Sequence, residues 1–281
     1  RNMAGRSALT KKKKLGYAFG IFSDSLYYNM FYTYYLTFLN EIVGIAPKYS
    51  SIIIFISIAW DAITDPLIGN YTDTVGVDKR KVMKRAVVPL GLVYVVAWSS
   101  IGMGLSSQFF KVLLYTVISM MIWLFYTYYC IPYYAVVAEI TDDYDERTEI
   151  RSQSSLLNAA AVGLGNILPA LVPEVAILLT AKYQSNSYAV IAALMSVGGI
   201  LTGLICAKSL EGVYEPKKPI AGQAIKKRKN SEVFKSFVSI LKMRPARLFL
   251  SFVFFFLVGS SMIQSNITYM VIDCIGMKYD T

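Results

Sequence analysis

Seven long apolar runs, separated by polar segments, divide the chain. A helix needs about 20 mostly apolar residues to cross a bilayer, and each run is close to that length or longer. The pattern therefore predicts seven membrane-spanning helices. Their expected ranges are 15–43, 50–71, 86–105, 112–138, 154–181, 188–207 and 248–276.

The polar segments divide the chain into four parts. Residues 1–14 form a polar arm that is expected in the cytoplasm, and 15–207 are expected to form a six-helix transmembrane bundle. The long connection 208–247 follows, and 248–281 hold the seventh helix, as the start of an incomplete second bundle. The connection is expected to contain a short amphipathic helix on the inner membrane surface, with a solvated linker as the alternative. Its apolar face consists of Val233, Phe234, Phe237, Val238 and Leu241.

The composition favours a membrane protein. Of 281 residues, 55% are apolar and 16% are charged, against roughly 25% charged in soluble domains. Mean hydropathy is +0.47. Charge this sparse excludes a disordered chain and disfavours a soluble fold. We expect an all-α polytopic membrane protein.

Basic residues are distributed unevenly about the expected membrane. The formal net charge is +10, and 24 of the 28 Lys and Arg residues fall on the same side as the amino terminus. Cytoplasmic segments carry such an excess, so we expect a multi-pass protein of the cell membrane with its amino terminus inside. The same rule accounts for the basic run 226–229. We therefore expect contact with the lipid bilayer and no nucleic-acid partner.

Two residue counts limit the chemistry. Histidine is absent, which excludes His-based zinc sites, His-ligated haem and Ser/His or Cys/His dyads. The three cysteines, Cys130, Cys206 and Cys274, lie in apolar runs without CxxC spacing, which argues against a disulfide framework or a metal cluster. We expect no catalytic residue, no enzymatic activity and no cofactor.

Acidic residues lie inside the first two spans, where an ionised side chain costs about 3 kcal/mol. Asp24 lies about 14 Å into the first span at 1.5 Å per residue. Asp61 and Asp65 lie one turn apart on one face of the second span. No Lys or Arg lies within the first six spans, so these carboxylates are expected to bind cations or protons. Structural hydrogen bonds to neighbouring helices are the alternative.

A hard cation requires several oxygen ligands. Asp61 and Asp65 offer carboxylate oxygens, and the hydroxyl groups of Thr64 and Thr127 are expected to add to them. Asp61 and Asp65 would then be the metal ligands if the cation is Na⁺.

The first and fourth spans are rich in aromatic residues. Interfacial belts account for roughly half of them. Tyr126 to Tyr134, however, lie in mid-span around Pro132, where lipid offers a phenol no hydrogen bond. Phenols and rings that face a cavity suit a polyhydroxylated ligand such as a sugar. The residues are Tyr27, Tyr28, Phe31, Tyr32, Tyr34 and Tyr35 in the first span, and Phe125, Tyr126, Tyr128, Tyr129, Tyr133 and Tyr134 in the fourth.

Charged residues also gather in the inner loops after the second and fourth spans, at 73–85 and 142–149. Ion pairs in these solvated loops are expected to connect neighbouring helices on the inner face. Glu139, at the inner end of the fourth span, fits either a solvated or a buried environment.

Four passages carry a resemblance to a known family: LGYAFGIFSDSLYYNMFYTYYL, AWDAITDPLIGNYTD, IPYYAVVAEITDDYDERTEI and MRPARLFL. The sequence resembles the glycoside–pentoside–hexuronide:cation symporters, the melibiose-permease-like branch of the major facilitator superfamily. The resemblance implies a twelve-helix fold of two six-helix bundles, with the substrate held between them and alternating access. This chain would form the amino-terminal bundle and the first helix of the second. The remaining carboxy-terminal half of the transporter is therefore an expected partner.

The resemblance also implies roles for individual residues. Asp61, Asp65 and Thr127 correspond to the family's cation site. Asp24 corresponds to a first-helix acid that holds sugar hydroxyls, and Tyr126 to a tyrosine of the substrate pocket. The expected substrate-binding set is Asp24, Tyr28, Tyr126, Cys130 and Tyr134.

Several positions depart from melibiose permease. Thr64 stands where that protein has Asn, which could shift the cation preference. Cys130 stands in place of a second sugar-binding Asp, and Tyr134 in place of a stacking Trp. Ser154 or Ser155 replaces an Arg of the fifth helix. Melibiose itself is therefore in doubt as the substrate, while the cation motif is intact.

The expected function is symport of a sugar or glycoside coupled to Na⁺, Li⁺ or H⁺. A major facilitator transporter of a lipid or an organic acid is an alternative, although an organic acid would require a cationic pocket that the first six spans do not offer. A seven-helix receptor or membrane enzyme is a further alternative, which a carboxy-terminal continuation with five more spans would exclude.

Overall fold

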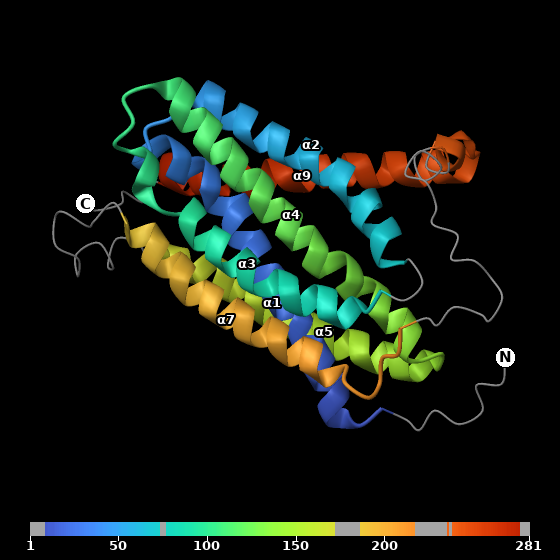
Figure 1. The fold of residues 1–281 in the computed structure, drawn as a ribbon. Coiled ribbons are helices and arrows are strands. Elements are labelled where there is room, and N and C mark those ends of the chain that lie inside the picture. Colours follow the sequence, from blue (N-terminus) through green and yellow to red (C-terminus); the bar gives the residue numbers. More distant parts are fainter. Residues whose placement is uncertain (1–8, 74–76, 172–185, 217–234, 236–237, 276–281) are drawn as a thin grey trace. The chain divides into compact units, whose positions relative to one another are not determined.

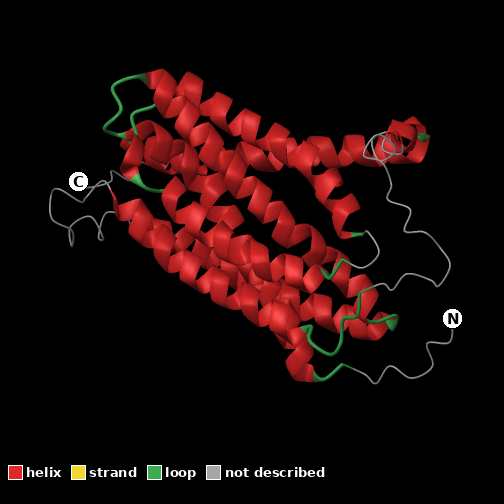
Figure 2. Cartoon of the chain, viewed as in Figure 1, coloured by secondary structure: helices red, strands yellow, loops and turns green. Residues whose placement is uncertain are grey.

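The computed structural model describes residues 9–73, 77–171, 186–216, 235 and 238–275. Backbone contacts divide the chain into two compact units, Arg1–Lys227 and Arg228–Thr281. The described elements of both units are helices joined by loops (Figures 1 and 2), which confirms the all-α fold class.

The described residues of the first unit form six long α-helices, which overlap the first six predicted spans. A π-helical turn, η1 (Phe38–Ile42), extends the first helix, and a short 3-10 turn, η2 (Ser100–Gly102), follows the third. The six are α1 (Lys11–Thr37), α2 (Pro47–Thr72), α3 (Lys79–Ala97), α4 (Gln108–Ile140), α5 (Tyr144–Ala170) and α7 (Ser187–Ser209).

Helix ends differ from the predicted spans where polar side chains cap the helices. α3 begins earlier, at Lys79, because the Asp78 carboxylate accepts hydrogen bonds from two backbone N–H groups of the first turn. α5 begins earlier, at Tyr144, because Asp143 caps it in the same way through one N–H group. The prediction that the third helix continues to residue 105 was wrong, since α3 ends at Ala97. The end of the predicted fifth span lies outside the described residues.

Three of the described helices, α2, α4 and α7, are long and apolar enough to cross a membrane by length and composition alone. α1 and α5 carry more polar side chains, and several of these face each other. Ser25 donates to the Asn158 side chain at 2.5 Å, and Thr33 donates to the Asn166 side chain at 3.2 Å. Hydrogen bonds between helices keep such groups satisfied away from water, so polar residues are compatible with a membrane bundle.

The helices of the first unit pack as a row rather than around one central helix. α2 packs on α4, α4 on α3, α3 on α7, α7 on α1 and α1 on α5 (Figure 1). Direct backbone approaches between α1 and α4 are few by comparison. These two helices are instead joined by long side chains, which matters for the site described below.

Exposed apolar side chains cover much of the outer surface of the bundle. A soluble protein would bury most of such residues, whereas a bilayer solvates them. They include Phe55, Leu92, Phe109, Leu194 and Leu201.

Close helix packing in the first unit depends on glycine at particular positions. The ring of Tyr27, on α1, lies against Gly199 of α7, where an added Cβ would lie 2.6 Å from the ring and from its hydroxyl oxygen. Tyr27 is almost fully buried, and its hydroxyl donates to the Ser196 carbonyl at 3.2 Å. The ring therefore has little freedom to move aside.

Gly199→Ala is expected to destabilise the full-length protein by about 1–3 kcal/mol, because the new methyl group overpacks the contact with Tyr27. Gly198→Ala is the matched control, since a Cβ there meets nothing within 4 Å. Thermal unfolding in detergent measures both variants. Equal midpoints for the two would contradict this account of the α1–α7 contact.

The second unit contains α9 (Arg244–Ile275), which overlaps the predicted seventh span. The residues just before it, 238–242, are helical, and Val238 and Leu241 are exposed. Val233, Phe234 and Phe237, the rest of the predicted amphipathic face, lie outside the described residues. The prediction of a helix on the membrane surface therefore stays a prediction.

Candidate functional site

A buried carboxylate on α1 accepts hydrogen bonds from three side chains of α4. Asp24 Oδ1 accepts from the Tyr126 hydroxyl at 2.5 Å and from the Cys130 thiol at 2.8 Å. Asp24 Oδ2 accepts from the Tyr134 hydroxyl at 2.7 Å. Asp24 is 6% exposed, while Tyr134 is 42% exposed, so this group of side chains reaches from the interior to the surface of the described bundle.

The spacing of the three donors explains how one carboxylate can meet them all. Tyr126, Cys130 and Tyr134 follow one another at intervals of four residues, which places them along one face of α4. The helix continues through Pro132, so the stripe is not interrupted. The tyrosine side chains are long enough to cross from α4 to α1 where the two backbones are not in close contact.

The second carboxylate group lies on α2 and also meets α4. The Thr127 hydroxyl donates to Asp61 Oδ1 at 2.9 Å. Asp65 lies one turn further along α2, on the same face, and interacts with both Asp61 and Thr127. Both carboxylates are partly buried, and Thr127 is 1% exposed.

Thr64 is hydrogen-bonded within its own helix. Its hydroxyl donates to the backbone carbonyl of Asp61 at 3.2 Å, within its own helix, and the side chain is buried. In this structure the hydroxyl proton is therefore engaged with the backbone. Only the oxygen lone pairs of Thr64 remain for a cation.

Adjacent residues of α4 connect the two carboxylate groups. Tyr126 donates to Asp24 of α1, and Thr127, the next residue, donates to Asp61 of α2. Successive residues of an α-helix point about 100° apart, so one turn of α4 can reach two different neighbours. A movement of this turn would displace contacts to both carboxylates at once.

The donor set suits a hard cation better than a transition metal. Asp61, Asp65 and Thr127 offer oxygen only, which favours hard cations over metals that prefer nitrogen or sulfur. Within the described residues, no group of three or more His, Cys, Asp or Glu side chains is placed to hold a metal ion. A cation here would depend on two carboxylates together with hydroxyl oxygens.

Tyr28 lies within electrostatic range of both Asp24 and Asp61. Its ring centroid is 6.5 Å from that of Tyr126 and 6.4 Å from that of Trp123. The sequence expectations did not include Trp123. The signal that could have found it is spacing, because Trp123 precedes Tyr126 by three residues and Thr127 by four, which places it on the same side of α4.

Ion pairs connect helices on the predicted inner face, as expected from the loop charges. Lys14, at the start of α1, contacts Glu146 at 3.3 Å and Glu149 at 2.6 Å, both on α5. The hydrogen bond to Glu149 is the largest of several effects that raise the pKa of Lys14. Burial raises the pKa of Glu146, but hydrogen bonds from Thr141, the Leu9 N–H and Lys14 outweigh it and leave the pKa lowered.

A second ion-pair group joins α2, α3 and α4. Lys79 is 2% exposed and contacts Asp73 at 2.8 Å and Glu139 at 3.0 Å. Burial lowers the pKa of Lys79, but the hydrogen bonds to the two carboxylates raise it by more than burial lowers it. The net pKa is raised, so the amine stays charged. Glu139 therefore takes part in a contact between helices. Asp78, in contrast, pairs at 3.0 Å with Arg80, in the first turn of the helix that Asp78 caps, and connects no two helices by that contact.

Lys79→Met is expected to destabilise the full-length protein by about 2 kcal/mol, because the Glu139 carboxylate loses the cation that it contacts while it remains largely buried. The exposed Lys84, on the same helix, provides the control Lys84→Met. Thermal unfolding in detergent compares the two. A midpoint for Lys79→Met that matches the Lys84→Met value would show that the ion pair adds nothing to stability.

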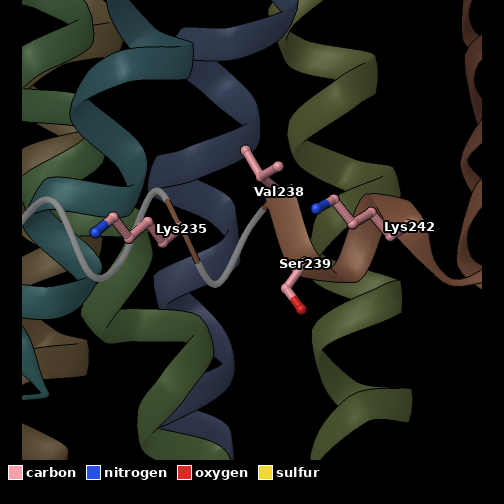
Figure 3. Close-up of a pocket in the computed structure, with 4 residues that line it drawn as sticks. All are labelled: Lys235, Val238, Ser239 and Lys242. Atoms are coloured by element: carbon pink, nitrogen blue, oxygen red, sulfur yellow. The ribbon is translucent and has the colours of Figure 1, made fainter.

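The second unit has a hollow of its own, lined by Lys235, Val238, Ser239 and Lys242 (Figure 3). Val238 belongs to the apolar face of the predicted amphipathic segment, and Lys235, Ser239 and Lys242 lie off that face. The four residues include no carboxylate and no aromatic ring, so this hollow differs in kind from the carboxylate groups of the first unit.

The fold and these buried carboxylates define a polytopic helical membrane protein with an acidic, aromatic-rich interior. The model of the family described as MFS/sugar transport protein matches residues 16–281, which is nearly the whole chain. The chain therefore belongs to this family of the major facilitator type.

Three curated relatives are named symporters. An uncharacterized symporter of Synechocystis is 32% identical over 145 residues, covering 50% of this chain and 27% of the relative. The uncharacterized symporter YjmB of Bacillus subtilis is 24% identical over 234 residues, covering 82% and 49% respectively. The inner membrane symporter YicJ of Escherichia coli is 27% identical over 165 residues, covering 57% and 35%. The aligned part of this chain spans at most about half the length of these relatives. Together with the fold, the matches identify a helical membrane protein of this family.

Proposed function

We propose that this chain is the amino-terminal part of a symporter that couples Na⁺, Li⁺ or H⁺ to the uptake of a sugar or glycoside by alternating access. The observation that carries the proposal is the turn of α4 in which Tyr126 contacts Asp24 and Thr127 contacts Asp61. A substrate and a cation bound at these two carboxylates would share one helical turn.

Asp24 is the proposed substrate-binding carboxylate. Its oxygens accept hydrogen bonds from two phenols and a thiol, and the hydroxyl groups of a sugar offer donors of the same kind. Tyr28, Tyr126 and Tyr134 would place apolar ring faces beside the C–H faces of the sugar. The loss of bonds from α4 on substrate binding would be compensated by bonds from the substrate.

Asp61 and Asp65 are the proposed cation ligands, with Thr127 as a further oxygen ligand and Thr64 as a weaker contributor. A cation would relieve the repulsion between the two carboxylates and orient Thr127. Because Tyr126 is the next residue, binding at one group would favour the geometry of the other. Linkage requires the reverse effect to be equally large in free energy.

The proposed location is the cell membrane, with the amino terminus in the cytoplasm. The excess of basic residues in the predicted inner segments supports this orientation. The remaining carboxy-terminal half of the transporter is the proposed partner, and it would cover the substrate group from the opposite side, as the repeat architecture of such transporters requires.

Uptake by the complete transporter in liposomes tests the proposal. Labelled monosaccharides, disaccharides, a lysophospholipid and a carboxylic acid are offered, with the Na⁺ and H⁺ gradients varied independently. We expect accumulation of at least one sugar that depends on one of these gradients and is abolished by the matching ionophore. Gradient-driven accumulation of the lipid or the acid, and of no sugar, would overturn the proposed substrate class.

A further inference from the structure

The second unit carries positive charge without a counter-charge. Residues 233–272 contain four basic side chains and no Asp or Glu. In the first unit, Lys14 and Lys79 each contact two carboxylates, whereas no ion pair joins the four cations to another residue that the structure describes. Their charge is therefore available to an anion from outside the chain. The four are Lys235, Lys242, Arg244 and Arg247.

Two of these cations share a hollow with a hydroxyl group (Figure 3). Lys235, Val238, Ser239 and Lys242 line the hollow, and all four are exposed. They follow one another at intervals of three, one and three residues, which is the spacing of a single helical face. Lys235 and Lys242 are about 10 Å apart along such a helix. Because lysine has a flexible stem and three rotatable donors, both amines can turn toward one anion over Ser239. Two ammonium groups and a hydroxyl suit a phosphate.

The hollow lies next to a helix whose surface is apolar. α9 begins at Arg244, two residues after Lys242, and overlaps the predicted seventh span. Five phenylalanine rings of its first half are each at least 61% exposed. A helix that exposes apolar rings in this way belongs in a bilayer or against other membrane helices. The segment just before it therefore lies where lipid headgroups begin. The five rings are Phe249, Phe252, Phe254, Phe255 and Phe256.

Apolar side chains beside the hollow distinguish a lipid from a soluble anion. Val238, Ile240, Leu241 and Met243 are each at least 41% exposed. Such side chains enter the boundary between headgroups and acyl chains, while lysines at the edge of the apolar face extend their amines to the headgroups. A lipid offers partners to both kinds of side chain, and inorganic phosphate offers partners to the lysines alone.

We propose that the face formed by Lys235, Ser239 and Lys242 binds the phosphate of an anionic phospholipid, in the leaflet from which α9 enters the bilayer. Groups of four to eight basic residues beside a membrane helix attract such lipids. The hollow has no carboxylate for the ammonium group of a zwitterionic headgroup, and its lysines would repel that group. The inference goes beyond the proposed transport, because it requires neither the sugar nor the coupling cation.

A general orientation signal would have a different consequence. Basic residues beside any membrane helix can favour one topology without a defined lipid site. The two lysines of the hollow would then affect lipid binding no more than two lysines beside another span. Lys11 and Lys12, in the first turn of α1, provide that comparison because both are exposed and neither lines the hollow.

Lipid binding to the full-length protein in a nonionic detergent tests the proposal. Phosphatidylglycerol or phosphatidylcholine is titrated, and native mass spectrometry gives the apparent Kd for the first lipid bound. We expect unmodified protein to bind phosphatidylglycerol at least about tenfold more tightly than phosphatidylcholine. Lys235→Gln combined with Lys242→Gln is expected to remove this preference. Ser239→Ala, which changes no charge, is expected to reduce it about threefold through the loss of one hydrogen bond.

Lys11→Gln combined with Lys12→Gln is the matched control, and it is expected to change the preference by less than about twofold, since salt screens charges that lie beyond a Debye length of the site. Thermal midpoints show whether all variants fold. An equal loss in the control pair, or no preference in unmodified protein, would overturn the lipid site. Displacement of the lipid by millimolar inorganic phosphate would identify a soluble anion instead and would also overturn it. Sugar uptake is a separate measurement, so failure here leaves the proposed transport in place.

Discussion

Asp61→Asn in the complete transporter is expected to abolish cation-driven accumulation of substrate. Asparagine keeps the shape of the side chain but removes the charge that a cation would neutralise. The ligand charge count sets much of the affinity for a hard cation, so we expect Na⁺ and H⁺ to give no stimulation of uptake even at about ten times the concentration that saturates the unmodified protein. Asp65→Asn, one turn away on the same face of α2, is expected to act in the same way.

Uptake into liposomes with an imposed ion gradient measures this effect. Asp145→Asn is the control, because Asp145 is exposed in the first turn of α5 and undergoes the same chemical change outside the site. Protein yield and the thermal midpoint show whether the variants fold. Unchanged cation-stimulated uptake in both the Asp61 and the Asp65 variants would rule out this pair as the coupling site.

Asp24→Asn is expected to remove substrate binding rather than cation coupling. The carboxylate accepts three hydrogen bonds in the structure, and hydrogen bonds to a charged group contribute about 1.5–3 kcal/mol each. In the proposed complex, hydroxyl groups of the substrate replace these donors on Asp24. Asparagine would weaken one or two of the resulting hydrogen bonds, so we expect the affinity for the substrate to fall about 100-fold.

Equilibrium binding of the labelled sugar at saturating cation measures the Asp24 effect separately from coupling. Tyr134→Phe provides a graded comparison, since it removes one of the three donors and keeps the ring. We expect it to weaken binding by less than Asp24→Asn does. Wild-type affinity in Asp24→Asn at saturating cation would show that the sugar binds elsewhere.

The membrane helices were largely accessible from the sequence. The thickness of the bilayer and the cost of placing a charge in it constrain each segment separately. Apolar runs and the polar segments between them therefore predict the spans without any information about neighbouring helices. The errors occurred at helix ends such as those of α3, where a capping Asp and a short turn decide the boundary locally. Hydropathy does not record such caps.

The candidate site was accessible only in part. Helical spacing placed Asp61 and Asp65 on one face, and the cost of a charge in lipid made Asp24 conspicuous. Spacing alone did not reveal that Thr64 donates to its own backbone or that the Trp123 N–H meets no acceptor among the described residues. Both facts depend on how a side chain meets its surroundings after packing.

By itself, the sequence determined how many helices to expect, which acids lie inside them and which faces those acids share, because these properties follow from local chain geometry and from the solvent. Tertiary structure alone decided the partners. Asp24 meets Tyr126, Cys130 and Tyr134, and Lys79 meets Glu139, across long stretches of intervening chain. The order in which the helices pack brings such groups together, and that order depends on the surface shapes of all the helices. Gly199 is one example, because only a residue without a Cβ leaves room there for the ring of Tyr27.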